Sequence, residues 1–227
     1  MGNKIRSSRW TPIIVPKDPF ENPIPWLERA AEKYNEQDAA VPEMQRNYRM
    51  EIDDVEAFYS RRYGDDLAHV VRVRRTALWI AKQIGGDLEI VNGAALLHDI
   101  ALTSERGEES TCHAREGAHM AGHVLESEGF EEDQIERICH CIAAHHVSEE
   151  IGPKTIEAKI LQDAEQLDAL GAIGIARAFV YAGLMQLPLH GDPNSEESGY
   201  EKQPITVINN IFEKIMGICP ESFHTEP

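Results

Sequence analysis

The sequence lacks long apolar runs: no stretch of about 18 apolar residues occurs anywhere in the chain. A membrane-spanning helix needs such a run, so none is predicted. The first residues, MGNKIRSSRWTPIIVPK, also lack the continuous apolar segment of a secretory signal peptide. We therefore expect a cytoplasmic protein.

Cysteine is scarce, and its spacing excludes two common kinds of site. None of the four residues forms the C-x-x-C pair that is typical of a zinc ribbon or a thiol-disulfide redox centre. We expect free thiols in a reducing compartment, which agrees with a cytoplasmic location. The four are Cys112, Cys139, Cys141 and Cys219.

Basic residues are also few. The chain has 22 Lys and Arg against 39 Asp and Glu, which gives a formal net charge of -17 at pH 7. Duplex nucleic acid and anionic membranes would be repelled by such a surface, so neither is an expected partner. A small anionic substrate remains compatible, because the local charge of a site can oppose the average.

Segments of alternating apolar and polar residues, which would indicate strands, are absent, so we predict an all-α fold. Apolar residues recur instead at helical spacing between breaks rich in Gly, Pro, Asn and Ser. The expected helices are 66–84, 88–101, 113–128, 132–146, 156–183 and 205–218.

The chain is long enough for one substantial core with an extension beside it. Residues 1–25 are rich in proline and predict an extended N-terminal arm, and residues 26–63 predict further helices of unknown role, the second over 43–63. The main helical domain is expected over 64–218, followed by a C-terminal tail at 219–227.

The stretch AALLHDI, residues 94–100, places His98 and Asp99 in an otherwise apolar helix. Apolar residues surround this helix on its wheel, which is typical of a helix in the middle of a bundle. A buried carboxylate must be hydrogen-bonded, neutralised or bound to a cation. A structural pair and a pair of metal ligands are equally compatible with this stretch alone.

Two further ionisable residues lie on or beside the apolar faces of other helices. His69 lies at the edge of the stripe of helix 66–84, and Asp163 lies at the centre of the apolar face of helix 156–183. On the same wheel, Glu165 and Asp168 point away from that centre. The inward groups come from three helices and are His69, His98, Asp99 and Asp163.

The other histidines can be sorted in the same way. His119 and His123 lie opposite the apolar stripe of their helix and are predicted to face solvent. His113 lies on the flank of that stripe, and at least one of His145 and His146 should face inward. Two imidazoles with two carboxylates suit one or two divalent metal ions such as Mn, Fe, Co, Zn, Ni or Mg.

The pattern His69, His98-Asp99, Asp163 resembles the H…HD…D signature of the HD-domain superfamily of metal-dependent phosphohydrolases, which has an all-α fold. Three longer blocks are similar to the small HD hydrolases of the YedJ and YpgQ type. The resemblance covers residues 64–215, so the main domain, 64–218, is identified as an HD domain. The three blocks are AHVVRV (68–73), AALLHDI (94–100) and DAEQLDALGAIGIAR (163–177).

The resemblance implies a metal centre and an activity. Its metal ligands would be His69, His98, Asp99 and Asp163, with His113 and His145 near a second ion. Metal-bound hydroxide would cleave a phosphate ester or anhydride bond of a nucleotide or another small phosphorylated compound. Nucleoside triphosphate pyrophosphohydrolysis is one such reaction.

The catalytic candidates are His98 and Asp99 themselves, together with Arg72 and Asp168. Arg72 lies one turn from His69 and is a candidate phosphate contact, with Arg177 as a weaker one. Asp168 could orient a histidine. Glu165 stands where the family pattern has a second aspartate, and its outward position on the wheel argues against a ligand role.

Two other classes of function stay open. HD-type scaffolds also host di-iron oxygenases, which would require the additional ligands His113 and His145. A regulatory module that binds a nucleotide without turning it over is the third class. A homodimer is compatible with each of them.

Overall fold

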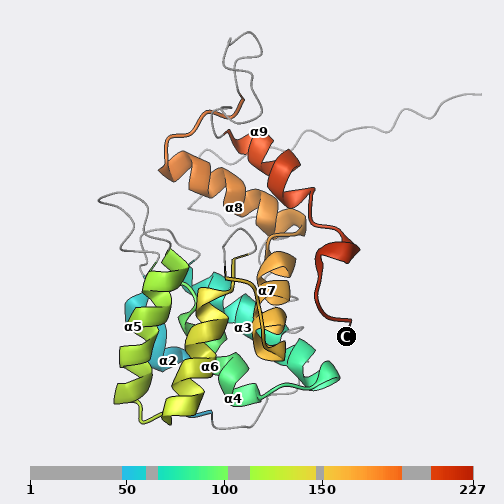
Figure 1. Cartoon of the computed structure of the whole chain (residues 1–227). Coiled ribbons are helices and arrows are strands. Elements are labelled where there is room, and N and C mark those ends of the chain that lie inside the picture. The colour runs from blue at the N-terminus through green and yellow to red at the C-terminus, as the bar shows by residue number, and fades with distance from the viewer. Residues whose placement is uncertain (1–47, 60–65, 102–112, 147–150, 191–205, 227) are drawn as a thin grey trace, which may run out of the picture. The chain divides into compact units, whose positions relative to one another are not determined.

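The computed structural model describes residues 48–59, 66–101, 113–146, 151–190 and 206–226 (Figure 1). These residues form helices, turns and irregular segments and contain no strand, which confirms the predicted all-α class. The chain divides into two compact units, residues 1–46 and 47–227. All described residues belong to the second unit, and the predicted N-terminal arm and the helix from residue 26 lie outside them.

Helix α4 (Leu88–Leu97) is the centre of the bundle. It packs against α3 (Asp66–Ile84), α6 (Glu132–Ala143) and α7 (Ile156–Asp168), while α5 (His113–Ser127) covers α6. Every residue from Ile90 to Leu97 is buried. A helix without a polar face must be enclosed on all sides, so the prediction of a central apolar helix is confirmed.

Polar caps and glycines set the ends of these helices, as the sequence predicts. The Asp87 side chain accepts a hydrogen bond from the Glu89 amide, and Thr155 does the same for Ala158. Gly85 and Gly86, which end α3, have φ values of 92° and 131°, a region that glycine adopts at low cost.

The predicted helix 156–183 is in fact two helices, α7 and α8 (Gly171–Leu184), bent by 79° at the break between them. Gly171 begins α8 with a φ of +68°. Gly174 lies so close to the bend that a Cβ atom there would stand 1.8 Å from the Ala169 carbonyl oxygen. A single helical wheel for residues 156–183 therefore superimposes two separate helices, whose buried faces do not coincide.

The close approach at Gly174 gives a first prediction. Gly174→Ala should destabilise the protein by about 2 kcal/mol or more, because the backbone must move to admit the methyl group. Gly183→Ala is the matched control in the same helix, since its Cβ would meet nothing within 4 Å. It should be neutral or stabilising by up to about 1 kcal/mol. Urea unfolding of both variants measures the difference, and equal stabilities would contradict the tight corner.

Residues 48–59 are not the continuous helix predicted over 43–63. They form a short helix, α2 (Ile52–Val55), that lies on α4, and a 3-10 turn, η1 (Glu56–Phe58), that follows it. The Asn92 side chain donates to the Met50 carbonyl at 2.8 Å, and the Tyr59 hydroxyl donates to the Leu96 carbonyl at 2.5 Å. These bonds tie the segment to the central helix.

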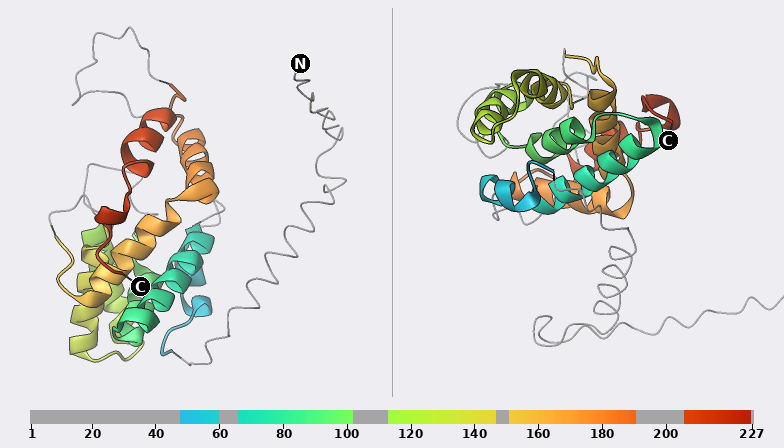
Figure 2. Two further views of the ribbon diagram at one scale, coloured as in Figure 1. Left: turned by 90° about the vertical axis from the view of Figure 1, so that its right-hand side faces the viewer. Right: turned by 90° about the horizontal axis from the view of Figure 1, so that it is seen from below.

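The last described residues, 206–226, pack first on α8 and then along α7. Helix α9 (Val207–Asn210) and the π-helical turn η2 (Ile211–Ile215) pack on α8, around Ala178, Ala182 and Val207. The chain then runs through η3 (Pro220–Ser222) alongside α7 (Figure 2). Among the described residues no single helix is long and apolar enough to cross a membrane; only α7 and α8 taken together pass by length and composition, and they are bent.

Candidate metal centre

His69, on α3, is held in one orientation. Its side chain is buried, and its Nδ1 lies 2.7 Å from an Asp168 carboxylate oxygen on α7. An ionised carboxylate only accepts hydrogen bonds, so Nδ1 carries the proton and donates. The Nε2 atom of His69 therefore faces the interior of the bundle.

His98, at the C-terminal cap of α4, is fixed in the same manner. It is fully buried, and its Nδ1 lies 2.9 Å from the Ala95 carbonyl oxygen, which again only accepts. Its Nε2 lies 3.3 Å from the Nε2 of His69. In their neutral forms the two imidazoles thus direct lone pairs at each other.

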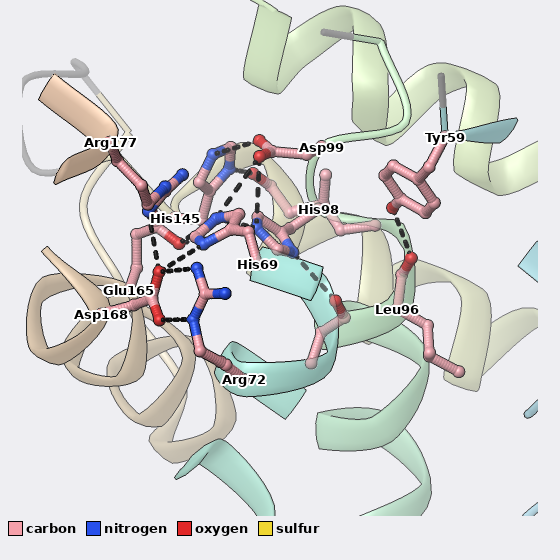
Figure 3. A network of polar contacts seen from close by, with 12 residues as sticks. Tyr59, His69, Arg72, Leu96, His98, Asp99, His145, Glu165, Asp168 and Arg177 are labelled. Carbon is pink, nitrogen blue, oxygen red and sulfur yellow. Dashed lines mark hydrogen bonds and ion pairs between the residues drawn. The ribbon is translucent and has the colours of Figure 1, made fainter. Parts of the chain in front are cut away.

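Two carboxylates complete the cluster (Figure 3). Glu165 Oε2, on α7, lies 3.1 Å from His69 Nε2 and 3.5 Å from His98 Nε2. Asp99 Oδ2, just after α4, lies 3.5 Å from both of these nitrogens. Each of the two carboxylates therefore has an oxygen within 3.5 Å of both imidazole Nε2 atoms.

The spacing of these atoms fits a bound metal ion. Nitrogen and oxygen ligands at about 2.0–2.2 Å from an ion lie about 3–3.6 Å from one another in tetrahedral or octahedral geometry. The distances in the cluster, 3.1–3.5 Å, are of that size. Lone pairs and carboxylate oxygens this close repel one another unless a cation lies between them. His69, His98 and Glu165 form a group that could hold such an ion, with Asp99 beside it.

The pKa values of His69 and Glu165 also indicate that the cluster favours a positive charge. Burial lowers the pKa of His69, but Glu165 and Asp168 outweigh burial and raise it to about 10. Burial raises the pKa of Glu165, but His69 and His98 hold it well below its usual range. The carboxylates therefore stay ionised and favour a cation among them.

Asp163, the predicted fourth ligand, is not brought into this cluster. Its side chain is fully buried, as predicted, but it lies against the C-terminal segment. Its oxygens accept hydrogen bonds from the backbone amides of His224 and Thr225 and from the Thr225 hydroxyl, at 2.6–3.0 Å. With its lone pairs used there, the interpretation of Asp163 as a ligand does not fit the structure.

Glu165 takes the position that sequence reasoning gave to Asp163, and the prediction that Glu165 points outward is wrong. On a wheel of α7 alone, Glu165 lies between Leu161 and Ala158, and both of these residues are buried. A helix end placed before Gly171 would have put Glu165 on the buried face of α7. Extending the helix to residue 183 instead moved the apparent centre of the apolar face toward Asp163.

Asp168 joins the cluster to two arginines. Its oxygens accept from Arg72 Nε at 2.6 Å and from Arg177 at 2.7 Å, in addition to the bond with His69. Burial raises the pKa of Asp168, but His69 and Arg72 lower it far below its usual range. The carboxylate is therefore ionised and can fix both the tautomer of His69 and the position of the guanidinium groups.

His145 lies next to the cluster, after α6. It is buried, its Nδ1 contacts the Ile142 carbonyl at 2.7 Å, and its Nε2 lies 3.7 Å from Asp99 Oδ1. Burial and the neighbouring His98 lower its pKa to about 4, so it is a neutral imidazole at pH 7. The side chain of His113, which begins α5, lies outside the described residues, whereas His119 and His123 are exposed, as predicted.

Comparison with known proteins identifies the family. The family model described as "HD domain" matches residues 66–170, which include all four clustered residues. Residues 66–170 are therefore identified as an HD domain. The resemblance found in the three sequence blocks is thereby confirmed.

Two relatives are similar to the HD domain and its surroundings. The uncharacterized protein YpgQ of Bacillus subtilis is 36% identical over 141 residues, which cover 60% of this chain and 65% of YpgQ. Ribonuclease Y of Cutibacterium acnes is 37% identical over 108 residues, 47% of this chain but only 18% of the ribonuclease. The crystal structure of B. subtilis YpgQ in complex with ADP matches with a TM-score of 0.52 and 29% identity, over 72% of this chain and 76% of that one. The chain thus spans less than two thirds of these two proteins by sequence.

Proposed function

We propose that the protein is a metal-dependent phosphohydrolase that cleaves a phosphate ester or anhydride bond of a nucleotide or another small phosphorylated compound. The observation that carries this proposal is the convergence of two imidazole nitrogens and two carboxylates at ligand spacing. His69, His98, Asp99 and Glu165 would hold the ion. Such an ion supplies a Lewis acid for a phosphoryl oxygen and acidifies a coordinated water.

Residues around the ligands support an anionic substrate. Arg72 and Arg177 both donate to Asp168, which places two guanidinium groups beside the cluster in a chain of net charge -17. Arg72 is 17% exposed and Arg177 33% exposed, so both can reach a bound phosphate. Asp168 would keep the guanidinium groups in place beside the reacting centre.

A nucleotide is the substrate class that we propose first. The related YpgQ was crystallised with ADP, and the cluster with its two arginines could contact successive phosphates of one chain. Cleavage of a nucleoside triphosphate to the monophosphate and pyrophosphate is the specific reaction to test. The ribonuclease Y relatives make a short RNA the necessary comparison substrate.

The test is an assay of the full chain, first stripped of metal, then supplied with Mn, Co, Ni, Zn or Mg and a panel of nucleotides. We expect phosphate or pyrophosphate release that requires an added ion and falls by at least about 1,000-fold in His98→Ala, which removes a ligand. His119→Ala, on the exposed face of α5, is the matched control and should keep full activity. No release from any compound with any ion would refute the proposal, and cleavage of RNA alone would reassign the substrate.

A two-ion oxygenase is a second candidate function, because His145 lies close to Asp99. Asp99 lies between the cluster and His145, so its carboxylate has oxygens within reach of both. Two irons per chain and an oxygen-dependent absorption spectrum would favour this function over hydrolysis.

A further inference from the structure

The outer face of α3 carries basic residues and a tryptophan but no acidic residue. Residues 67–86 contain no Asp or Glu, although acids outnumber bases by 39 to 22 in the whole chain. Four side chains, spaced three or four positions apart, lie within about 80° of one another on the helical wheel of α3. These residues, called here the α3 stripe, are Arg72, Arg75, Trp79 and Lys82.

The α3 stripe is accessible to a ligand. Trp79 is 53% exposed, and Arg75 and Lys82 are also exposed. Arg74 points the other way and donates to Asn92 at 2.6 Å and to Glu51 at 2.7 Å, so it joins α3 to its neighbours. A single exposed tryptophan is ordinary, but a tryptophan among cations on one face has the composition of a surface that binds single-stranded nucleic acid.

We propose that the α3 stripe binds a short single-stranded nucleic acid. Arg75 and Lys82 would contact its phosphates, and an unpaired base would stack on the Trp79 indole. Every base has a flat face, so this binding would not depend on the base sequence. From Arg72 to Lys82 the helix rises by about 15 Å, which spans about four stacked nucleotides at about 3.4 Å each.

Arg72 joins the α3 stripe to the candidate metal centre (Figure 3). It donates to Asp168 at 2.6 Å, and Asp168 holds His69. A strand bound along the stripe would therefore lead its phosphates toward the cluster, where one end of the strand would be the phosphorylated group that the site receives. This direction of the strand rests on the proposed function, whereas its binding to the stripe does not.

Charge and composition favour a single strand over a duplex or a membrane. A duplex carries twice the charge of one strand per unit length, which the acidic remainder of the chain would repel, and its bases are stacked in pairs out of reach of Trp79. A helix that lies on an anionic membrane needs a broad apolar face as well as cations. Trp79 is the one large apolar side chain of the stripe.

Fluorescence anisotropy of the full chain in chelator tests the binding without any turnover. The probes are fluorescein-labelled oligouridylate and oligothymidylate of about ten nucleotides, which separate RNA from DNA. We expect a Kd on the order of 10 µM at low salt for at least one of them. Trp79→Ala should weaken the binding by about fivefold or more, because it removes the stacking surface. Trp79→Phe keeps a ring and should retain most of the affinity.

Lys82→Gln tests the phosphate contacts by a different readout. The loss of one cation should lower the slope of log Kd against log salt concentration by about 0.7. Two variants outside the α3 stripe are the matched controls. Tyr181→Ala removes an aromatic side chain that is also 53% exposed, and Lys214→Gln removes an exposed lysine. Neither control should change the affinity or the slope.

Three results would overturn the proposal, provided that circular dichroism shows folded protein. The first is no binding of either oligonucleotide at the lowest salt. The second is equal weakening by Trp79→Ala and Tyr181→Ala. The third is binding of polyglutamate in place of both oligonucleotides, which would assign the stripe to an acidic protein. Failure of the proposed function looks different, because the oligonucleotides would then bind in chelator while no ion supports phosphate release.

Discussion

Glu165→Gln is expected to lower the affinity for a divalent ion by at least about 100-fold, because it removes the charge of one of the proposed ligands. The change keeps the length of the side chain and nearly its volume, so the fold should be retained. Glu165 Oε2 lies 3.1 Å from His69 Nε2, and no neutral amide oxygen can replace its charge there. Calorimetric titration of Mn²⁺ into chelator-treated protein measures the affinity.

The matched control for this prediction is Asp163→Asn, two residues away on the same helix. Asp163 lies against the C-terminal segment, so this variant should keep the ion with less than about a tenfold change in affinity. If Asp163→Asn lost the ion and Glu165→Gln kept it, Asp163 would be the ligand and the position of α7 would be wrong.

Asp163→Asn should instead have a large effect on stability, of about 3 kcal/mol. Asp163 is buried and receives the amides of His224 and Thr225 and the Thr225 hydroxyl. An asparagine has one acceptor oxygen, and its NH₂ group would face donors, so buried N–H groups would lose their partners. For a chain of this size we expect the melting temperature to fall by about 6–12 °C.

Thermal unfolding of metal-free protein checks this second prediction. Thr225→Val serves as the comparison, because it removes only the hydroxyl bond to Asp163 and should cost about 1 kcal/mol. The two changes should not be additive, since they act on one contact. A melting temperature of Asp163→Asn within 2 °C of the wild type, where about 6 °C or more is expected, would show that the C-terminal segment does not hold α7.

The central part of the fold could be predicted from the sequence because it depends on local patterns. Apolar residues around the whole of α4 require enclosure, and Asp87 and Thr155 are caps that act within a few residues. His98 and Asp99 stood out for the same reason, since ionisable groups in an apolar helix must find partners on other helices.

The fourth position of the cluster could not be predicted, because it depends on a bend. Gly171 and Gly174 allow α8 to turn away from α7, and glycine alone does not show whether a helix stops. The helical wheel therefore indicated Asp163, which is buried, as a metal ligand in place of Glu165. Its real partners, residues 224 and 225, are about sixty positions away in the sequence and form no periodic pattern.

The sequence predicted only that Asp168 could orient a histidine. The structure shows that this histidine is His69. Asp168 was placed on the outer side of the wheel, yet its side chain is 7% exposed. It is enclosed because α3 crosses α7 at this point and brings His69 and Arg72 against it. Such crossings follow from how whole helices pack and not from the pattern within either one.

The most direct test is an anomalous diffraction map of a crystal of the full chain grown with Mn²⁺. We expect one strong peak about 2 Å from the Nε2 atoms of His69 and His98, with oxygens of Asp99 and Glu165 completing its coordination. No peak should lie within coordination distance of Asp163. A peak bound by Asp163, or peaks only at exposed side chains such as His119 and His123, would contradict the proposed metal centre.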